Sequence, residues 1–217
     1  MKNDAVMIAK RLLHKQKERI RIGWKASRLK NHRFTLLSNN CIAGIIYHDV
    51  GEQFCSPTIN LLIKNQDFLT FIENLEDCLT QEIHEVASGE AYPVGCIELP
   101  GSKIYIHFMH YKSFREAVDK WESRKKRINK DNLFVLMEMG PDTREETVQR
   151  FLRLPFSNKM AFVNVDTDNA NLFNPGIYGD DYHAGKILEF DKKKLKMQRY
   201  LDRFNYVKWL NSGIVNR

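Results

Sequence analysis

The stretch FTLLSNNCIAGIIYHDVGEQFCSPTINLLI, residues 34–63, decides the fold. Its first apolar run, 34–37, predicts a buried strand, and the polar segment Ser38-Asn39-Asn40-Cys41 follows at once. A second apolar run, 42–47, is compatible with either a helix start or a strand. Polar side chains at the end of a buried strand are where α/β proteins usually place their chemistry. The stretch therefore predicts an α/β protein with a candidate site directly after its first strand.

Strands and helices alternate downstream of this stretch. Ser56 and Pro57 are a favourable N-cap and first helical residue, and they predict a helix running through residue 63. The next expected elements are a helix capped by Asp67 and a hairpin of strands 94–99 and 103–109 that turns at Pro100-Gly101. A helix over 113–127, with Ser113 and Glu116 as its capping box, precedes a buried strand 132–139. A helix that begins at a Thr143–Glu146 capping box, a buried strand 160–165 and a last helix over 195–211 complete the chain.

The order strand, helix, strand, helix, strand over residues 103–165 predicts right-handed crossovers and a parallel sheet there. We therefore expect an α/β fold with a mainly parallel sheet and flanking helices, in a Rossmann-like layering. The hairpin 94–109 and the C-terminal tail are candidates for a small second α+β subdomain. The segment Ser38-Asn39-Asn40 lacks the glycines of a phosphate-cradling loop, so neither a dinucleotide site nor a P-loop is predicted.

Charge divides the chain into three parts. Residues 1–33 hold 11 Lys and Arg against two acidic residues, and residues 191–217 hold eight against two. Residues 34–190 hold 15 Lys and Arg against 23 acidic residues. We expect a basic N-terminal helical arm over 1–33, an α/β domain over 34–190 and a basic C-terminal helix over 191–217 that packs on it. Because the body is acidic, a nucleic-acid partner is disfavoured in spite of the overall charge of +7.

Composition excludes several classes of protein. Hydrophobic residues make up 43% of the 217 residues, which favours a globular domain with a sizeable core. No apolar run approaches the roughly 18 residues of a membrane span, and no apolar segment of a secretory signal follows Met1, so we expect a cytoplasmic protein. The four cysteines, Cys41, Cys55, Cys78 and Cys96, form no CxxC pair, which argues for reduced thiols rather than a zinc knuckle or a disulfide scaffold.

The expected N-terminal helix, residues 4–30, has a narrow apolar stripe among many basic residues. It is compatible with a solvated helix that packs on the domain. It is also compatible with a helix that lies on an anionic membrane surface with Trp24 at the interface, which would make the protein peripheral to the inner membrane face. The oligomeric state stays open.

Three motifs carry a resemblance to a known family. They are Ser38-Asn39-Asn40-Cys41, then Ser56-Pro57-Thr58-Ile59-Asn60-Leu61, and then the block with His107, His110-Tyr111, Trp121, Arg124, Arg127, Ile128 and Asn129. With them, residues 34–165 resemble the bacterial domain-of-unknown-function family usually labelled exopolysaccharide biosynthesis protein. The resemblance implies a role in the synthesis or modification of a cell-surface glycan. It implies no catalytic residues, because none are established for that family.

Parallel strands deliver the residues at their carboxyl ends to one edge of the sheet, and those residues form the candidate site. A first hypothesis is a glycosyl or related transferase that uses a sugar nucleotide or another glycan precursor. Asp166 and Asp168 would hold Mg²⁺ or Mn²⁺ against a diphosphate, and Arg124 would neutralise phosphate charge. The DxD pattern is equally compatible with a solvated turn.

A second hypothesis is acyl or phosphoryl transfer through Cys41, with His107 or His110 as the base. A buried inert cysteine is the alternative. The complete predicted site comprises Cys41, His107, His110 and Asp166 as catalytic residues, Ser38, Asn39, Asn40, Tyr111 and Arg124 as substrate-binding residues, and Asp166 and Asp168 as metal ligands. A third hypothesis is an accessory protein that binds a glycan, a lipid or a partner without catalysis.

Overall fold

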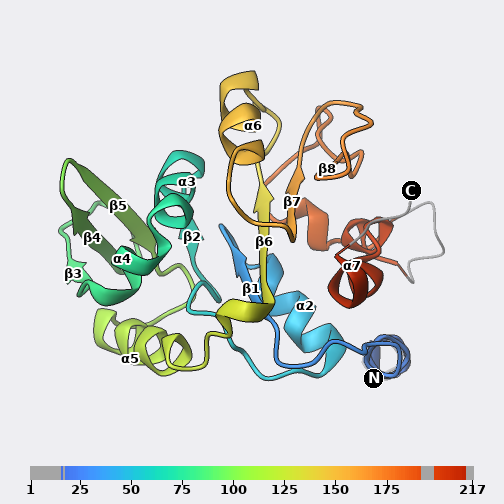
Figure 1. The fold of residues 1–217 in the computed structure, drawn as a ribbon, viewed down its shortest axis with the longest axis horizontal. Helices are drawn as coiled ribbons and strands as arrows, with labels where there is room; N and C mark the ends of the chain where they lie inside the picture. The colour runs from blue at the N-terminus through green and yellow to red at the C-terminus, as the bar shows by residue number, and fades with distance from the viewer. Residues whose placement is uncertain (1–15, 17, 192–197, 214–217) are drawn as a thin grey trace, which may run out of the picture.

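A computed structural model of the chain describes residues 16, 18–191 and 198–213. Two four-stranded sheets lie toward opposite ends of the longest axis of the molecule (Figure 1). One sheet is parallel and the other is antiparallel, and helices flank both. The predicted α/β class with a second α+β unit is confirmed.

The parallel sheet has the order β1-β6-β7-β8, which places β1 at one of its edges. Its strands are β1 (Thr35–Ser38), β6 (Leu133–Glu138), β7 (Lys159–Phe162) and β8 (Leu172–Phe173). All residues of β1, β6 and β7 are buried, as their almost unbroken apolar sequences require. This sheet forms the centre of the fold.

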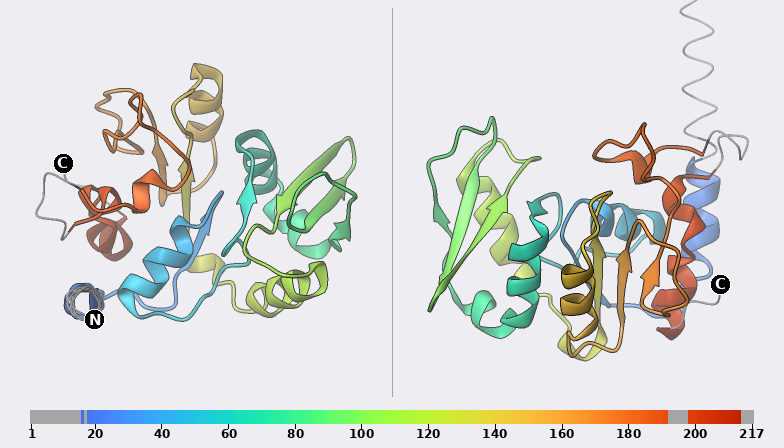
Figure 2. Two further views of the ribbon diagram at one scale, coloured as in Figure 1. Left: turned by 180° about the vertical axis from the view of Figure 1, so that it is seen from behind. Right: turned by 90° about the horizontal axis from the view of Figure 1, so that it is seen from above.

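Helices cover the two faces of the parallel sheet. On one face lie α2 (Ile42–Val50) and α7 (Tyr206–Ser212), and on the other lie α3 (Asn65–Glu73) and α6 (Glu145–Leu152) (Figures 1 and 2). The N-terminal helix (residues 18–26) lies outside this layer, against α2 and the C-terminal segment. Successive residues of β6 point to opposite faces, so Phe134 meets Trp209 of α7 while Val135 belongs to the core that includes α3 and α6.

The antiparallel sheet has the order β2-β5-β4-β3. It is formed by β2 (Leu62–Ile63), β3 (His84–Glu85), β4 (Val94–Leu99) and β5 (Ser102–His107), and it is accompanied by α4 (Leu75–Thr80) and α5 (Phe114–Lys125). Ile104 and Ile106 are fully buried on its inner side, as the predicted alternation requires. The N–H of Ile63 donates to the Asn39 carbonyl (2.8 Å), which joins this sheet to the end of β1.

The helix predicted from Ser56 to Ile63 is wrong. Residues 56–61 are irregular and lead into β2. The hydroxyls of this segment serve the neighbouring strand instead: Thr58 Oγ1 accepts from Ser38 N–H (3.0 Å) and Ser56 Oγ contacts Thr58 Oγ1 (3.1 Å). The need to satisfy the buried edge of β1 outweighs the local helix-start signal.

The prediction that strand 103–109 joins the parallel sheet is also wrong. β4 pairs with β5 along its whole length and β2 occupies the other edge of β5. A strand with both edges paired has no backbone groups left for another sheet. The strand next to β6 is therefore β1, from the opening stretch of the sequence.

Three smaller expectations need correction. Thr143 forms no capping box, because its hydroxyl donates to the Gly140 carbonyl (2.9 Å) and accepts from Asn164 N–H (3.1 Å). The last helix is broken: a 3-10 turn, Tyr200–Arg203, precedes α7, whose cap is Asn205, and residues 192–197 lie outside the described residues. The tail packs on the parallel sheet and not on the hairpin. The Ser113 cap of α5 is confirmed, because Ser113 Oγ accepts from Glu116 N–H.

Candidate active site

The candidate site lies where the chain leaves β1 and β6 at the carboxyl edge of the parallel sheet. β1 leads into α2 on one face, whereas β6 leads into α6 on the opposite face (Figure 1). Two adjacent parallel strands whose connections go to opposite faces form a topological switch point, at which the two loops separate. Ligands of open parallel sheets bind outside such points, so this edge is the expected position of a binding or active site.

Cys41 and His110 come together at this edge. Cys41 is the last residue before α2, and His110 lies in the turn after β5. The His110 Nε2 atom is 3.1 Å from Cys41 Sγ, and the Cys41 thiol also points to the Leu61 carbonyl at 3.9 Å. Cys41 is half-buried and His110 is exposed. The arrangement meets the condition set by the thiol hypothesis, which required a partly exposed Cys41 within reach of a histidine.

Burial raises the pKa of the Cys41 thiol. The cysteine therefore stays protonated near neutral pH until a base removes its proton. A ring nitrogen at 3.1 Å is within the hydrogen-bond distance needed for that transfer.

Asn39 completes the end of the sheet and is a structural residue. Its side-chain amide forms the two hydrogen bonds that the backbone of a neighbouring strand would form. It accepts from Glu138 N–H (2.9 Å) and donates to the Glu138 carbonyl (2.9 Å). Asn39 also donates to Asn65 Oδ1 (3.1 Å), and Asn65 donates to the Met139 carbonyl (2.9 Å). These bonds fix the path of the chain where β6 ends.

Asn40 links the start of α2 to a buried carboxyl group. Its Oδ1 accepts from Ile42 N–H (3.1 Å), which satisfies one of the free amides of the first helical turn. Its Nδ2 donates to Glu138 Oε2 at 2.6 Å. Cys41 lies next to Asn40 in sequence, so one short segment carries the thiol and holds the carboxyl group.

Glu138 is only 8% exposed, and its carboxyl oxygens accept hydrogen bonds from two neutral side chains, Asn40 and Tyr182. Burial raises the pKa of Glu138, although hydrogen bonds from Asn40 and Tyr182 act in the opposite direction. Tyr182 donates to Glu138 Oε1 at 3.5 Å. The ring centroids of Tyr178 and Tyr182 are 5.2 Å apart, so the loop after β8 brings an aromatic pair to this carboxyl group.

The remaining predicted substrate-binding residues have structural partners. Ser38 is buried and its hydroxyl donates to Asn40 Oδ1 (3.3 Å). Arg124, which was expected to neutralise phosphate charge, is buried, and it donates to Tyr111 Oη (2.6 Å) and to the Ile59 carbonyl (3.2 Å). Tyr111 donates to the same carbonyl (2.9 Å). This group fastens α5 to the segment before β2.

His107, the other predicted base, lies in β5 and packs against the ring of Tyr92. Burial, with a contribution from Lys64, lowers its pKa. The structure brings His110, and not His107, to Cys41.

Asp166 and Asp168 are exposed on the loop between β7 and β8. Asp166 Oδ1 accepts from Asn174 Nδ2 (2.9 Å), a contact typical of a solvated loop. β7 is two strands away from β1, or about 10 Å at the usual strand spacing. Within the described ranges, no three His, Cys, Asp or Glu side chains are grouped as a metal site would need.

The sequence indicated Glu138 as the residue at the end of strand 132–139 but suggested no role for it, and it did not place Tyr178 or Tyr182 in the site. A single carboxylate closing an otherwise apolar strand, LFVLME at 133–138, was the available signal for Glu138. The two tyrosines carried no such signal, because a long connection returns them to the sheet edge.

Comparisons with known proteins agree with one another. A family model described as "Domain of unknown function (DUF1919)" matches residues 11–211. A Haemophilus influenzae protein, described as an uncharacterized protein, is 37% identical over 188 residues, which cover 85% of this chain and 87% of that protein. No helix in the described part of the chain is both long enough and apolar enough to cross a bilayer. With nearly its whole length matched, the chain belongs to the DUF1919 family.

Proposed function

We propose that the protein is a group-transfer enzyme in which Cys41 is the nucleophile and His110 is its general base. The observation that carries this proposal is the 3.1 Å contact between Cys41 Sγ and His110 Nε2 at the switch point of the parallel sheet. Acyl transfer is the reaction that this pair suits best, because thiols form acyl intermediates readily once they are deprotonated.

The steps use groups that are present at the edge. His110 takes the thiol proton as Cys41 Sγ attacks the carbonyl carbon of an activated acyl donor, and the proton then passes to the leaving group. An acceptor hydroxyl attacks the resulting thioester, gives its proton to His110 and releases the Cys41 thiolate, which recovers that proton. Because burial raises the Cys41 pKa, deprotonation is coupled to substrate attack and not completed beforehand.

The surroundings of Cys41 favour the charged intermediate of this reaction. Cys41 stands at the N-terminus of the nine-residue helix α2, where backbone amides and the helix dipole favour negative charge. Glu138, whose pKa is raised by burial and whose carboxyl group is held by Asn40, is a candidate for positioning the acceptor hydroxyl.

A role in the synthesis or modification of a surface polysaccharide belongs to the same proposal and rests on the family resemblance. The acceptor would then be a hydroxyl of a glycan precursor. The alternative of glycosyl transfer from a sugar nucleotide, with Mg²⁺ or Mn²⁺ on Asp166 and Asp168, has less support because these side chains lie in an exposed loop two strands away. A thermal shift with Mn²⁺ and nucleotide sugars that is lost in Asp166→Asn would favour it.

Acylation by a simple activated ester tests the proposal. Incubation with p-nitrophenyl acetate should place one acetyl group on Cys41, detected by peptide mass spectrometry. His110→Gln should slow acylation by about 10²- to 10⁴-fold, the usual contribution of a general base. Cys55→Ser is the matched control, because Cys55 is also a half-buried thiol and its loss should leave the rate unchanged. Equal acetylation of Cys41 in the wild type and in His110→Gln would contradict the proposal.

A further inference from the structure

The N-terminal helix (residues 18–26) is packed with its charged side inward. Arg21 and Lys25, one turn apart, lie on the face toward the protein, and Lys25 is 6% exposed. Ile20 and Trp24, also one turn apart, are 71% and 53% exposed. A surface helix normally shows the reverse arrangement, with apolar residues inside and charges outside. Both features need an explanation.

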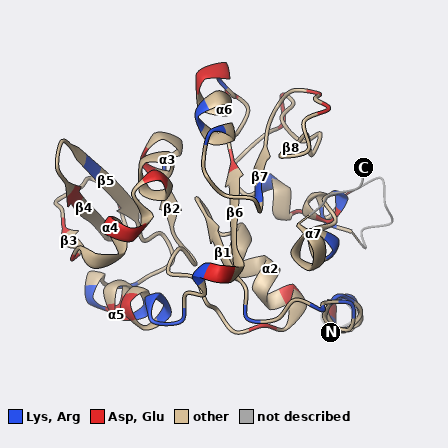
Figure 3. Ribbon diagram, viewed as in Figure 1, with Lys and Arg blue, Asp and Glu red and all other residues tan. Residues whose placement is uncertain are grey.

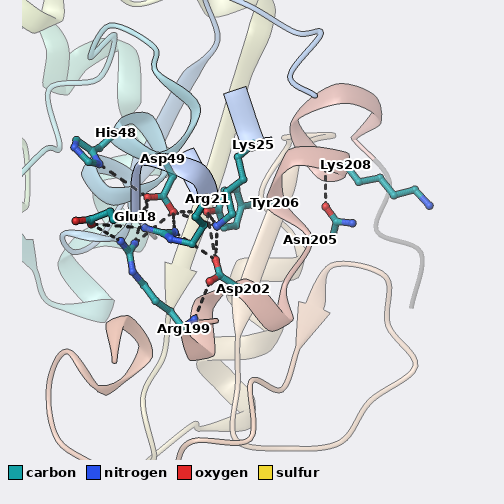
Figure 4. A network of polar contacts seen from close by, with 10 residues as sticks. All are labelled: Glu18, Arg21, Lys25, His48, Asp49, Arg199, Asp202, Asn205, Tyr206 and Lys208. Atoms are coloured by element: carbon teal, nitrogen blue, oxygen red, sulfur yellow. Dashed lines mark hydrogen bonds and ion pairs between the residues drawn. The ribbon is translucent and has the colours of Figure 1, made fainter. Parts of the chain in front are cut away.

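A buried ionic network explains the inward face (Figure 4). Asp49 of α2 is fully buried and receives two hydrogen bonds from Arg21, at 2.6 and 3.0 Å, and one from Lys25 at 3.2 Å. Arg199 approaches the same carboxylate at 3.3 Å, and Lys25 also pairs with Asp202. The network ties the helix to both α2 and the C-terminal segment, which fixes its rotation about its own axis. The outward face of Ile20 and Trp24 is therefore set by the fold.

The outward face is apolar, and Lys and Arg recur along the helix that carries it (Figure 3). The Arg28 guanidinium lies 3.8 Å from the centre of the Trp24 ring, and Arg19 is exposed beside Ile20. Glu18 is the single acidic residue among residues 16 and 18–33, and it turns away from this face to pair with Arg199. In the sequence, residues 1–33 carry 11 Lys and Arg against two acidic residues.

We infer that this face, Ile20 and Trp24 with Arg19 and Arg28, docks the protein on an anionic lipid surface. Exposed aliphatic and indole side chains enter the region between headgroups and acyl chains, while arginines at the margin meet the lipid phosphates. A second copy of the chain is disfavoured as the occupant, because two identical cationic faces would repel each other. The ionic network holds the helix in the docking orientation before binding, so little ordering is needed on contact.

Trp24 supplies a direct probe of docking. Of the three tryptophans in the chain, Trp121 and Trp209 are each 1% exposed and only Trp24 faces solvent. Vesicles of phosphatidylglycerol and phosphatidylcholine should shift the emission of the full-length protein to the blue, reduce its quenching by acrylamide and sediment the protein. Vesicles of phosphatidylcholine alone should do none of these, and high salt should reverse the binding.

The variant Ile20→Ser/Trp24→Ser should lower co-sedimentation by at least about tenfold without changing the melting temperature, since both side chains are exposed. The matched control is Tyr105→Ser/Met109→Ser, which removes two exposed apolar side chains from the antiparallel sheet end and should bind like the wild type. Equal binding to neutral vesicles, or equal binding by the two double variants, would overturn the inference. A concentration-dependent dimer that Ile20→Ser/Trp24→Ser abolishes would assign the face to a second copy instead.

Discussion

Two buried carboxyl groups of this protein have opposite surroundings. Glu138, at the carboxyl edge of the parallel sheet, accepts hydrogen bonds from the Asn40 amide and the Tyr182 hydroxyl, and burial raises its pKa. Asp49, in α2, is also affected first by burial, but hydrogen bonds from Arg21 and Tyr206 and the charges of Arg199 and Lys25 bring its pKa below the usual value. The fold thus favours the neutral form of one carboxyl group and the charged form of the other.

This difference in partners suits Glu138 to a role in a reaction and Asp49 to a role in holding the helices together. A carboxyl group whose neutral form is favoured can act as a proton donor, which is useful beside a reactive thiol. A carboxylate surrounded by cations stays ionised and acts as an anchor, here for the N-terminal helix and the C-terminal segment. The raised pKa of Glu138 and the lowered pKa of Asp49 both depend on which side chains the fold places around each carboxyl group.

Removing the charge of Asp49 should have the largest effect on stability. Asp49→Asn leaves Arg21, Lys25 and Arg199 without their shared counter-charge in a buried setting, and it should lower the free energy of unfolding by about 3–5 kcal/mol. Urea unfolding at neutral pH measures this. Glu138→Gln is the matched control, since it makes the same change at the neutral site and should cost less than about 1 kcal/mol at that pH. Equal losses would mean that the two environments do not differ as described.

Removing one neutral donor from the anchor should cost less. Tyr206 is buried and its hydroxyl donates to Asp49 Oδ2. Tyr206→Phe keeps the ring and deletes the hydrogen bond donated to Asp49 and the one accepted from Lys25, so we expect a loss of about 1.5–3 kcal/mol in unfolding experiments. If Tyr206→Phe were as stable as the wild type, the cations alone would account for the state of Asp49.

The two carboxyl groups should respond to pH in opposite directions. Because the folded pKa of Glu138 is raised, its contribution to stability is full below the unfolded pKa of about 4.3 and is lost as pH rises through the folded pKa. The wild type should therefore lose stability relative to Glu138→Gln between about pH 4 and 7, by about 1.4 kcal/mol for each unit of the pKa difference. Urea midpoints of both proteins across this range test it.

The contribution of Asp49 to stability should change with pH in the opposite direction. Its folded pKa is lowered, so its contribution is full above the unfolded pKa of about 3.9 and is lost as pH falls through the folded pKa. The advantage of the wild type over Asp49→Asn should shrink at acid pH and stay constant above about pH 5. A constant difference down to pH 2 would contradict the assignment of Asp49 as the ionised anchor.

An exposed ion pair should show the smallest effect. Lys130 and Glu76 form a pair whose side chains are 58% and 68% exposed. Solvent and salt screen such a pair, so Glu76→Gln should change the free energy of unfolding by less than about 1 kcal/mol. A loss comparable to that of Asp49→Asn would show that burial is not what distinguishes the anchor.

Local sequence patterns predicted which residues form strands and helices better than they predicted which of these elements lie side by side. The sequence predicted β1, β6 and β7 from their apolar runs and the start of α5 from its cap, because burial patterns and capping depend on nearby residues. The helix expected at Ser56 was wrong because its hydroxyls satisfy β1, a strand some twenty residues earlier. The sheet assignment of β5 was wrong because β2, a two-residue strand with no sequence signal, occupies its free edge.

For the candidate site, the sequence indicated Cys41 and the two histidines as candidates for one chemistry. It gave no means to choose between His107 and His110, because they differ by three residues and only the turn after β5 directs one of them to the thiol. Arg124 was misread for a related reason: a basic residue on a charged helix was expected to face solvent, yet a buried carbonyl and a tyrosine hydroxyl recruit it.

The sequence alone determined that this chain forms a buried parallel sheet with helices and that polar residues follow the first strand, since hydrophobic periodicity and capping are local properties. Only the tertiary structure decided which side chains meet. It set His110 against Cys41, Asn40 and two tyrosines against Glu138, and three cations around Asp49. Contacts between residues 28 to 150 positions apart depend on strand order and connection paths, and these are fixed by the packing of the whole chain.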